Sequence, residues 1–121
     1  MLPAPNRLRE RSDFTSAVRS FGGCRAGSRL LVVHATSTGA RAGLPPRVGF
    51  VVSKAVGGAV VRNRTKRRLR ALLAQRLDGI PTSVDLVVRA NPPAGQASSR
   101  ELEQALDPLL RRVVKGLGGV A

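Results

Sequence analysis

The sequence is poor in aromatic side chains, in carboxylates and in cysteine. It has three Phe but no Tyr or Trp among 121 residues, and seven Asp or Glu against 21 Lys or Arg. Its one cysteine, Cys24, excludes an internal disulfide and a multi-cysteine zinc site. No apolar run approaches the roughly 20 residues of a membrane span, and no apolar segment typical of a signal peptide follows Met1. We therefore expect a cytoplasmic protein with no membrane partner.

What remains is a strongly basic chain of a size that suits one domain. Its formal net charge is +14, and its length predicts a single domain over residues 1–121 with one modest core. A compact chain with this excess repels itself unless a polyanion neutralises it, so a nucleic acid is the first partner to expect. A merely soluble basic protein, or one drawn to anionic lipid, remains open at this point.

The positive charge is concentrated in the middle of the chain. Between Asp13 and Asp78 there is no carboxylate, and the same window holds thirteen Arg or Lys residues. This window also contains the most apolar stretches, so the charge belongs to folded structure rather than to a basic tail.

Hydrophobic spacing predicts helices and strands in alternation, as expected for one α+β domain. Apolar residues at helical spacing predict helices over residues 13–20, 59–77 and 100–115. Short apolar runs rich in β-branched residues predict strands over 29–36, 47–53 and 84–89. The last helix is expected to be capped by Ser98 or Ser99.

The helix expected over 59–77 carries the densest charge, with six cations between Arg62 and Arg70. The spacing predicts that Arg64, Arg67, Arg68 and Arg70 point largely away from the apolar side. Like charges at i+3 and i+4 repel by a few tenths of a kcal/mol per pair, a cost that a polyanion would offset by counterion release. A solvated helix face is the ordinary alternative, but the missing acidic counterparts favour contact with nucleic acid. Asn63, a poor helix former, either contacts a sugar or base edge or is a tolerated surface residue.

The sequence shows no pattern for a protein active site. Nucleases usually gather carboxylates around metal ions about 3.5–4 Å apart. Here the aspartates fall in four separate predicted segments, at Asp13, Asp78, Asp85 and Asp107. His34 has no recognisable Ser or Cys partner. We expect no catalytic residue and no metal ligand set in this chain.

The run RVGFVVSKAVGGAVVRNRTKRRLR, from Arg47 to Arg70, resembles the signature of the bacterial ribonuclease P protein subunit. The family's hallmark is an Arg-Asn-Arg in a basic helix that follows a strand, a Ser-Lys and a glycine turn. The match extends to LRERSDF at 8–14 and VDLVVR at 84–89, in the family's order and spacing. Together these segments span most of the chain.

The resemblance implies an α-β-β-β-α-β-α two-layer sandwich, similar to domain 2 of a small-subunit ribosomal protein. Its βαβ crossover would be left-handed, against the usual rule, with the basic helix as the crossover. The protein would join a catalytic RNA, and the complex would act as an endonuclease that removes the 5′ leader of precursor tRNA. The RNA and the substrate would hold the Mg²⁺ ions, so the protein would be an accessory subunit. No DNA partner is expected.

The resemblance also assigns residues to the two RNA partners. Those that match the motif facing the catalytic RNA are Arg62, Asn63, Arg64, Lys66, Arg67, Arg68 and Arg70. The leader would lie between the first helix and the sheet, near Phe14, Val18, His34, Arg47, Phe50 and Lys54.

The leader cleft is expected to offer little stacking surface. Phe14 matches a family aromatic and could stack on a base for roughly 1–3 kcal/mol, although a core position is equally open. Val18 and His34 stand where many members carry aromatic residues. Contact with the leader should therefore depend on Arg, Lys and backbone groups, and should be sensitive to salt.

The main alternative is a ribosomal or ribosome-assembly RNA-binding protein of similar fold, without a nuclease role. A DNA-binding module fits less well, because the sequence has no helix-turn-helix pair and no dimer seam.

Overall fold

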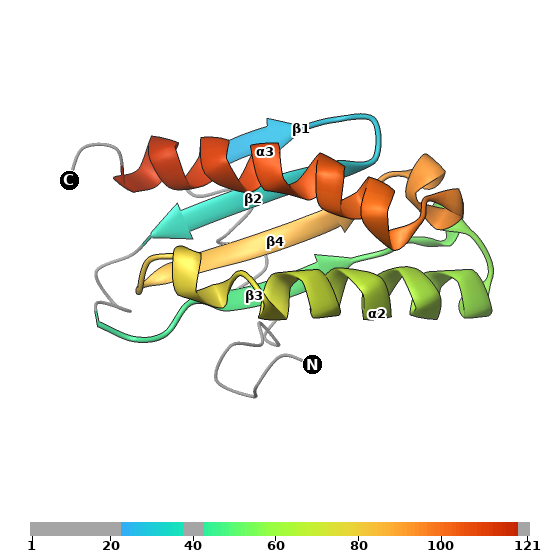
Figure 1. Ribbon diagram of the computed structural model, residues 1–121, viewed down its shortest axis with the longest axis horizontal. Coiled ribbons are helices and arrows are strands. Elements are labelled where there is room, and N and C mark those ends of the chain that lie inside the picture. Colours follow the sequence, from blue (N-terminus) through green and yellow to red (C-terminus); the bar gives the residue numbers. More distant parts are fainter. Residues whose placement is uncertain (1–22, 38–42, 119–121) are drawn as a thin grey trace.

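A four-stranded sheet covered on one face by two helices makes up the described part of the computed structural model, residues 23–37 and 43–118 (Figure 1). The strands are β1 (Cys24–Gly27), β2 (Leu31–Ser37), β3 (Arg47–Val51) and β4 (Val84–Ala90). The helices are α2 (Ala59–Ala74) and α3 (Ser99–Gly118), with 3₁₀ turns η3 (Lys54–Val56), η4 (Leu77–Gly79) and η5 (Pro92–Gln96). The helix expected over 13–20, with Phe14 and Val18, lies outside the described residues.

The strands lie in the order β1-β2-β4-β3. β2 is antiparallel to β1 and to β4, whereas β3 and β4 run parallel and are connected through α2. Viewed with α2 in front of the sheet and with both strands pointing upward, β4 lies to the left of β3 (Figure 1). The expected left-handed crossover is therefore confirmed, together with the α+β fold.

The core lies between the sheet and the two helices. Strand alternation turns Leu31, Val33 and Ala35 of β2 toward the helices, and all three are completely buried. Apolar residues at helical spacing cover them from the other side: Leu69, Leu72 and Leu73 from α2, and Leu102, Leu106, Leu109 and Val113 from α3.

The first turn of α3 is closed by a capping box. The Oγ of Ser98 accepts a hydrogen bond from the amide of Glu101 at 3.1 Å, and Glu101 Oε1 accepts one from the amide of Ser98 at 3.0 Å. These bonds hold the pKa of Glu101 below its usual value. Of the two serines expected as caps, Ser98 is the one that acts.

The largest differences from the expected elements concern β1, α2 and α3. β1 was not predicted from its residues, because Cys-Arg-Ala-Gly is too short to show alternation. α2 ends at Ala74 rather than 77, since the chain tightens there into η4. α3 continues to Gly118 instead of ending at 115. Among the described residues, no helix is long and apolar enough to cross a membrane.

Candidate RNA-binding surfaces

One side of α2 is packed in the core and the opposite side is exposed and cationic. Leu69 and Leu73 are completely buried, and Thr65 donates a hydrogen bond from Oγ1 to the carbonyl of Val61 at 2.9 Å. The residues exposed along the opposite side, here called the exposed stripe, are Val60, Asn63, Arg67 and Arg70. Val60 is 79% exposed, so even the apolar member of the stripe is free of protein contacts over most of its surface.

Two arginines of the same helix bind the protein instead of pointing to solvent. Arg64 Nη2 donates to the carbonyl of Gly95 at 2.9 Å, and Arg68 Nη1 donates to the carbonyl of Ala97 at 2.7 Å. Both side chains are half-buried against η5 and the residue that follows it. The spacing predicted that these two arginines lie off the apolar side of α2, and they do. It did not indicate their partners, because the turn that binds them is contributed from about thirty residues further along the chain.

The remaining two cations of the motif, Arg62 and Lys66, are half-buried. The seven residues predicted to face the catalytic RNA thus divide into three exposed ones and four that are partly covered. All seven are brought together on one helix, as expected.

The sheet face opposite α2 and α3, here called the second face, carries a cluster of three basic side chains. In the strand register, His34 of β2 lies opposite Arg25 of β1 and beside Val87 of β4, and Arg89 lies two residues further along β4. Alternation places Arg25, His34 and Arg89 on the same face. Partial burial, and then the positive charges of Arg25 and Arg89, hold the pKa of His34 below its usual value. The local field is positive, which suits an anionic ligand.

Arg47 also lies on the second face, but it binds a carboxylate of the protein. Its Nε and Nη2 donate to the two carboxylate oxygens of Asp85 at 2.9 and 2.7 Å. Asp85 is buried, so this bidentate pair is a charge-assisted contact with little competition from water. A contact of Arg47 with an RNA leader stays a prediction, and it would have to share the guanidinium with Asp85.

Phe50 and Lys54 lie apart from the basic cluster. Phe50 shares the helix-covered face with Val48 and packs against the core, since strand alternation turns it away from Arg47. Lys54 is exposed in η3, on the connection from β3 to α2. The structure therefore brings His34 and Arg47 to one face, and it does not bring Phe50 to them.

These surfaces occur in a chain whose sequence and fold match known proteins. The sequence profile of the family Ribonuclease P matches residues 2–114. The chain belongs to the Ribonuclease P family. Among its relatives, the ribonuclease P protein component of Streptomyces bikiniensis is 52% identical over 122 residues, covering 96% of this chain and 98% of the relative. That of Beutenbergia cavernae is 57% identical over 107 residues, covering 88% and 87%.

Solved structures of ribonuclease P proteins share the fold. The Staphylococcus aureus protein superposes with a TM-score of 0.76 at 26% identity, covering 90% of this chain and 97% of its own. The Thermotoga maritima protein in complex with 1-(4-fluorophenyl)-2-thiourea gives 0.73 at 25% identity, covering 90% and 98%. The expected membership of the ribonuclease P protein family is thus confirmed.

In this Ribonuclease P family member, two basic residues of the second face were not identified from the sequence as candidate binding residues. Arg25 and Arg89 belong to different strands, and only the β1-β2-β4 register brings them to His34. The signal in the sequence was weak: Arg89 ends an apolar run, and Arg25 belongs to a strand of four residues.

Most described carboxylates of this Ribonuclease P family member have partners within the protein. Asp85 binds Arg47, whereas Glu103 and Asp107 both bind Arg76. In the ranges 23–37 and 43–118, no three His, Cys, Asp or Glu side chains lie close enough together to hold a metal ion.

Proposed function

We propose that this chain is the protein subunit of a cytoplasmic ribonuclease P and that it binds two RNAs. The catalytic RNA would lie along α2, and the 5′ leader of precursor tRNA would lie on the second face. The observation that carries the proposal is the exposed stripe of α2, where Asn63, Arg67 and Arg70 are exposed on a helix that contains no carboxylate.

The arrangement of α2 suits a phosphate backbone. Arg67 and Arg70 are exposed and repel one another, so a polyanion relieves that repulsion and releases its own condensed counterions. Arg64 and Arg68 are held beside them by η5, so their side chains lose less rotational freedom when an RNA binds. The helix is thus a preorganised cationic surface, with Asn63 able to donate to a sugar or a base edge.

The second face suits a single-stranded RNA that is bound through its phosphates. Arg25, His34 and Arg89 present two permanent positive charges and one titratable group within adjacent strands. Since the chain has three Phe and no Tyr or Trp, stacking contributes little and the contact should be strongly salt-dependent. Phe14 and Val18 remain predicted leader contacts outside the described residues, and Lys54 a predicted contact in η3.

The role proposed for the protein in leader removal is electrostatic. By neutralising phosphates of the leader and of the catalytic RNA, it lowers the repulsion between the two and allows them to approach at lower Mg²⁺ concentration. We propose that the RNA and the substrate hold the Mg²⁺, because four of the five described Asp and Glu side chains bind arginines or cap a helix. No side chain of this chain is assigned a chemical step.

Binding selectivity tests the proposal against a ribosomal or DNA-binding role. The purified full chain is titrated with its cognate ribonuclease P RNA, a ribosomal RNA fragment of equal length and duplex DNA, across a series of salt concentrations. Preference for the ribonuclease P RNA, and for precursor tRNA over mature tRNA in the assembled complex, supports it. Equal affinity for the ribosomal fragment and no effect of the leader would contradict it.

A further inference from the structure

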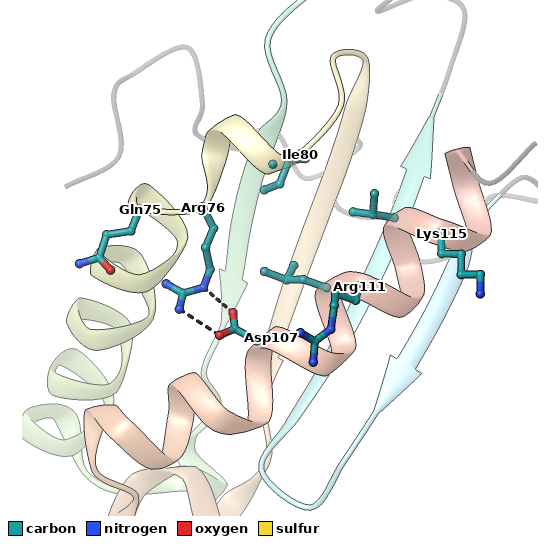
Figure 2. A pocket seen from close by; sticks show the side chains of 9 residues that line it. Gln75, Arg76, Ile80, Asp107, Arg111 and Lys115 are labelled. Carbon is teal, nitrogen blue, oxygen red and sulfur yellow. Dashed lines mark hydrogen bonds and ion pairs between the residues drawn. The ribbon is translucent and has the colours of Figure 1, made fainter. Parts of the chain in front are cut away.

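A pocket of about 530 Å³ lies between the end of α2 and the second half of α3 (Figure 2). Its volume is in the range of small-molecule sites. The residues that line it are Gln75, Arg76, Gly79, Ile80, Asp107, Leu110, Arg111, Val114 and Lys115.

The inner wall of the pocket is apolar. Ile80 and Leu110 are 6% and 8% exposed, and Val114 is half-buried against the same core. Within residues 23–37 and 43–118, no aromatic side chain lines the pocket. A flat apolar group that enters the pocket would displace water from this aliphatic surface, and this displacement favours binding.

The rim of the pocket is mainly cationic. Arg111 and Lys115 are exposed one turn apart on α3, and the exposed Gln75 lies at the end of α2, with its side chain directed away from α3 (Figure 2). The one acid at the rim, Asp107, is bound by Arg76, which holds the pKa of that carboxyl below its usual range. Arg76 also binds Glu103 at 2.7 Å. Two carboxylates thus face three cations, Arg76, Arg111 and Lys115, so the net charge here is positive.

The pocket continues the exposed stripe. Arg67, Ala71 and Gln75 follow one another at intervals of four residues, and all three are exposed along one row of α2. An RNA strand that contacts Arg67 and Arg70 and continues toward the C-terminal end of α2 would reach the pocket at Gln75.

We propose that this pocket receives the base of an unpaired nucleotide from the RNA bound along α2. The base would lie on Ile80, Leu110 and Val114, and the phosphates of the nucleotide would contact Arg111 and Lys115. A nucleotide matches both the apolar wall and the cationic rim, whereas an apolar peptide side chain uses only the wall. The inference rests on the proposed RNA binding by α2.

Ile80 provides a direct probe because it is the only isoleucine of the chain. A single-stranded pentaribonucleotide of mixed sequence is titrated into the full chain, and the δ1-methyl resonance of Ile80 is followed together with the amides of α2. A base in the pocket gives a ring-current shift of that methyl group that saturates with the α2 amides. Chemical-shift changes of the α2 amides with no change at the Ile80 methyl group would overturn the binding of a base in the pocket, but not RNA binding by α2. No shift at either place overturns the RNA binding on which it depends.

A blocking variant tests the same pocket in the assembled complex. A Cβ added at Gly79 meets nothing within 4 Å, so Gly79→Leu puts a side chain at the opening without a clash. The matched control is Thr82→Leu, which adds the same group at an exposed residue that does not line the pocket. We expect Gly79→Leu to weaken binding of the cognate ribonuclease P RNA by roughly fivefold and Thr82→Leu to leave it unchanged. Equal affinities for the two variants would overturn the proposal.

The rim is tested by a pair of neighbours on α3. Arg111 lines the pocket and Arg112 does not, although both are exposed. Arg111→Gln should reduce the slope of affinity against salt concentration by about one phosphate contact, and Arg112→Gln by less than half as much. Equal reductions would show only the loss of general positive charge and would contradict a phosphate at the rim.

Discussion

Arg64 donates a hydrogen bond from Nη2 to the carbonyl oxygen of Gly95, 31 residues away in the chain, at 2.9 Å. The contact ties the basic helix to η5, and Arg68 repeats it one turn later with Ala97. It depends on glycine, because a Cβ at residue 95 would lie 2.4 Å from the carbonyl oxygen of Val56. The basic helix α2 and the turn after β4 are thus a single unit.

Replacing Gly95 should destabilise that unit. Gly95→Ala forces η5 away from Val56 and loosens the hydrogen bond to Arg64, at a cost of about 1–3 kcal/mol. Urea unfolding followed by circular dichroism measures the change. Gly79→Ala is the control, because a Cβ there meets nothing within 4 Å, and its unfolding midpoint should stay within error of the parent chain. Equal midpoints for both variants would contradict the close approach.

Arg67 and Arg64 should differ in what their loss affects. Arg67 is exposed, so Arg67→Gln should lower affinity for the catalytic RNA and reduce the salt slope by about one, without changing stability. Arg64→Gln should lower the affinity and also the free energy of unfolding, by about 1 kcal/mol, since it loses the bond to Gly95. Filter binding across a salt series and urea unfolding separate the two effects. If Arg67→Gln leaves the slope unchanged, the exposed stripe does not bind RNA.

His34 should report an anion on the second face through its protonation. In the free protein its pKa lies below the usual value of about 6.5. The unfolded chain therefore binds this proton more readily, and stability falls as pH drops below that value. A bound leader phosphate would offset the positive charges of Arg25 and Arg89 and raise the pKa of His34. Leader affinity should therefore rise as pH falls through that pKa.

The titration of His34 can be followed by NMR without ambiguity, because it is the only histidine. Adding a single-stranded leader oligonucleotide should raise its pKa. Arg89→Gln should raise the pKa in the free protein by removing one positive charge, and Arg100→Gln, an exposed arginine in the first turn of α3, should leave it unchanged. A leader that binds tightly without moving the pKa would mean that it does not lie on this face.

The Arg47–Asp85 pair should be important for stability. Asp85→Asn leaves the guanidinium of Arg47 without its buried carboxylate, and loss of one partner of a buried pair costs about 3–5 kcal/mol. Asp78→Asn, at an exposed residue of η4, is the control and should change the free energy of unfolding by less than about 0.5 kcal/mol. Thermal and urea unfolding give both values. Similar stabilities for the two variants would show that Arg47 is available to a ligand at little cost.

Local signals in the sequence were sufficient for the main elements. The leucines at 69, 72 and 73 define the buried side of α2, and Val84-Asp85-Leu86-Val87-Val88 is apolar enough to identify β4. Sequence resemblance supplied what these patterns do not contain, including the presence of a third strand before the basic helix and the hand of the crossover. The extent of α2 was overestimated because Leu77 continues the helical spacing, although the chain has already turned into η4.

The rest could not be predicted because it depends on contacts between distant segments. Nothing near Arg64 in the chain indicates that Gly95 lies beside it. The neighbours of His34 depend on strand register, which a four-residue strand such as β1 does not reveal. The pairing of Arg47 with Asp85 is of the same kind, since the two residues meet only when β3 and β4 align in parallel.

The most direct test of the account is cleavage of precursor tRNA by the cognate ribonuclease P RNA, with and without this protein, over a range of Mg²⁺ concentrations. We expect the protein to lower the Mg²⁺ concentration for half-maximal cleavage at physiological salt, and the double variant Arg67→Gln and Arg70→Gln to lose most of that effect. A Mg²⁺ dependence that is the same with and without the protein would contradict its role as the ribonuclease P subunit.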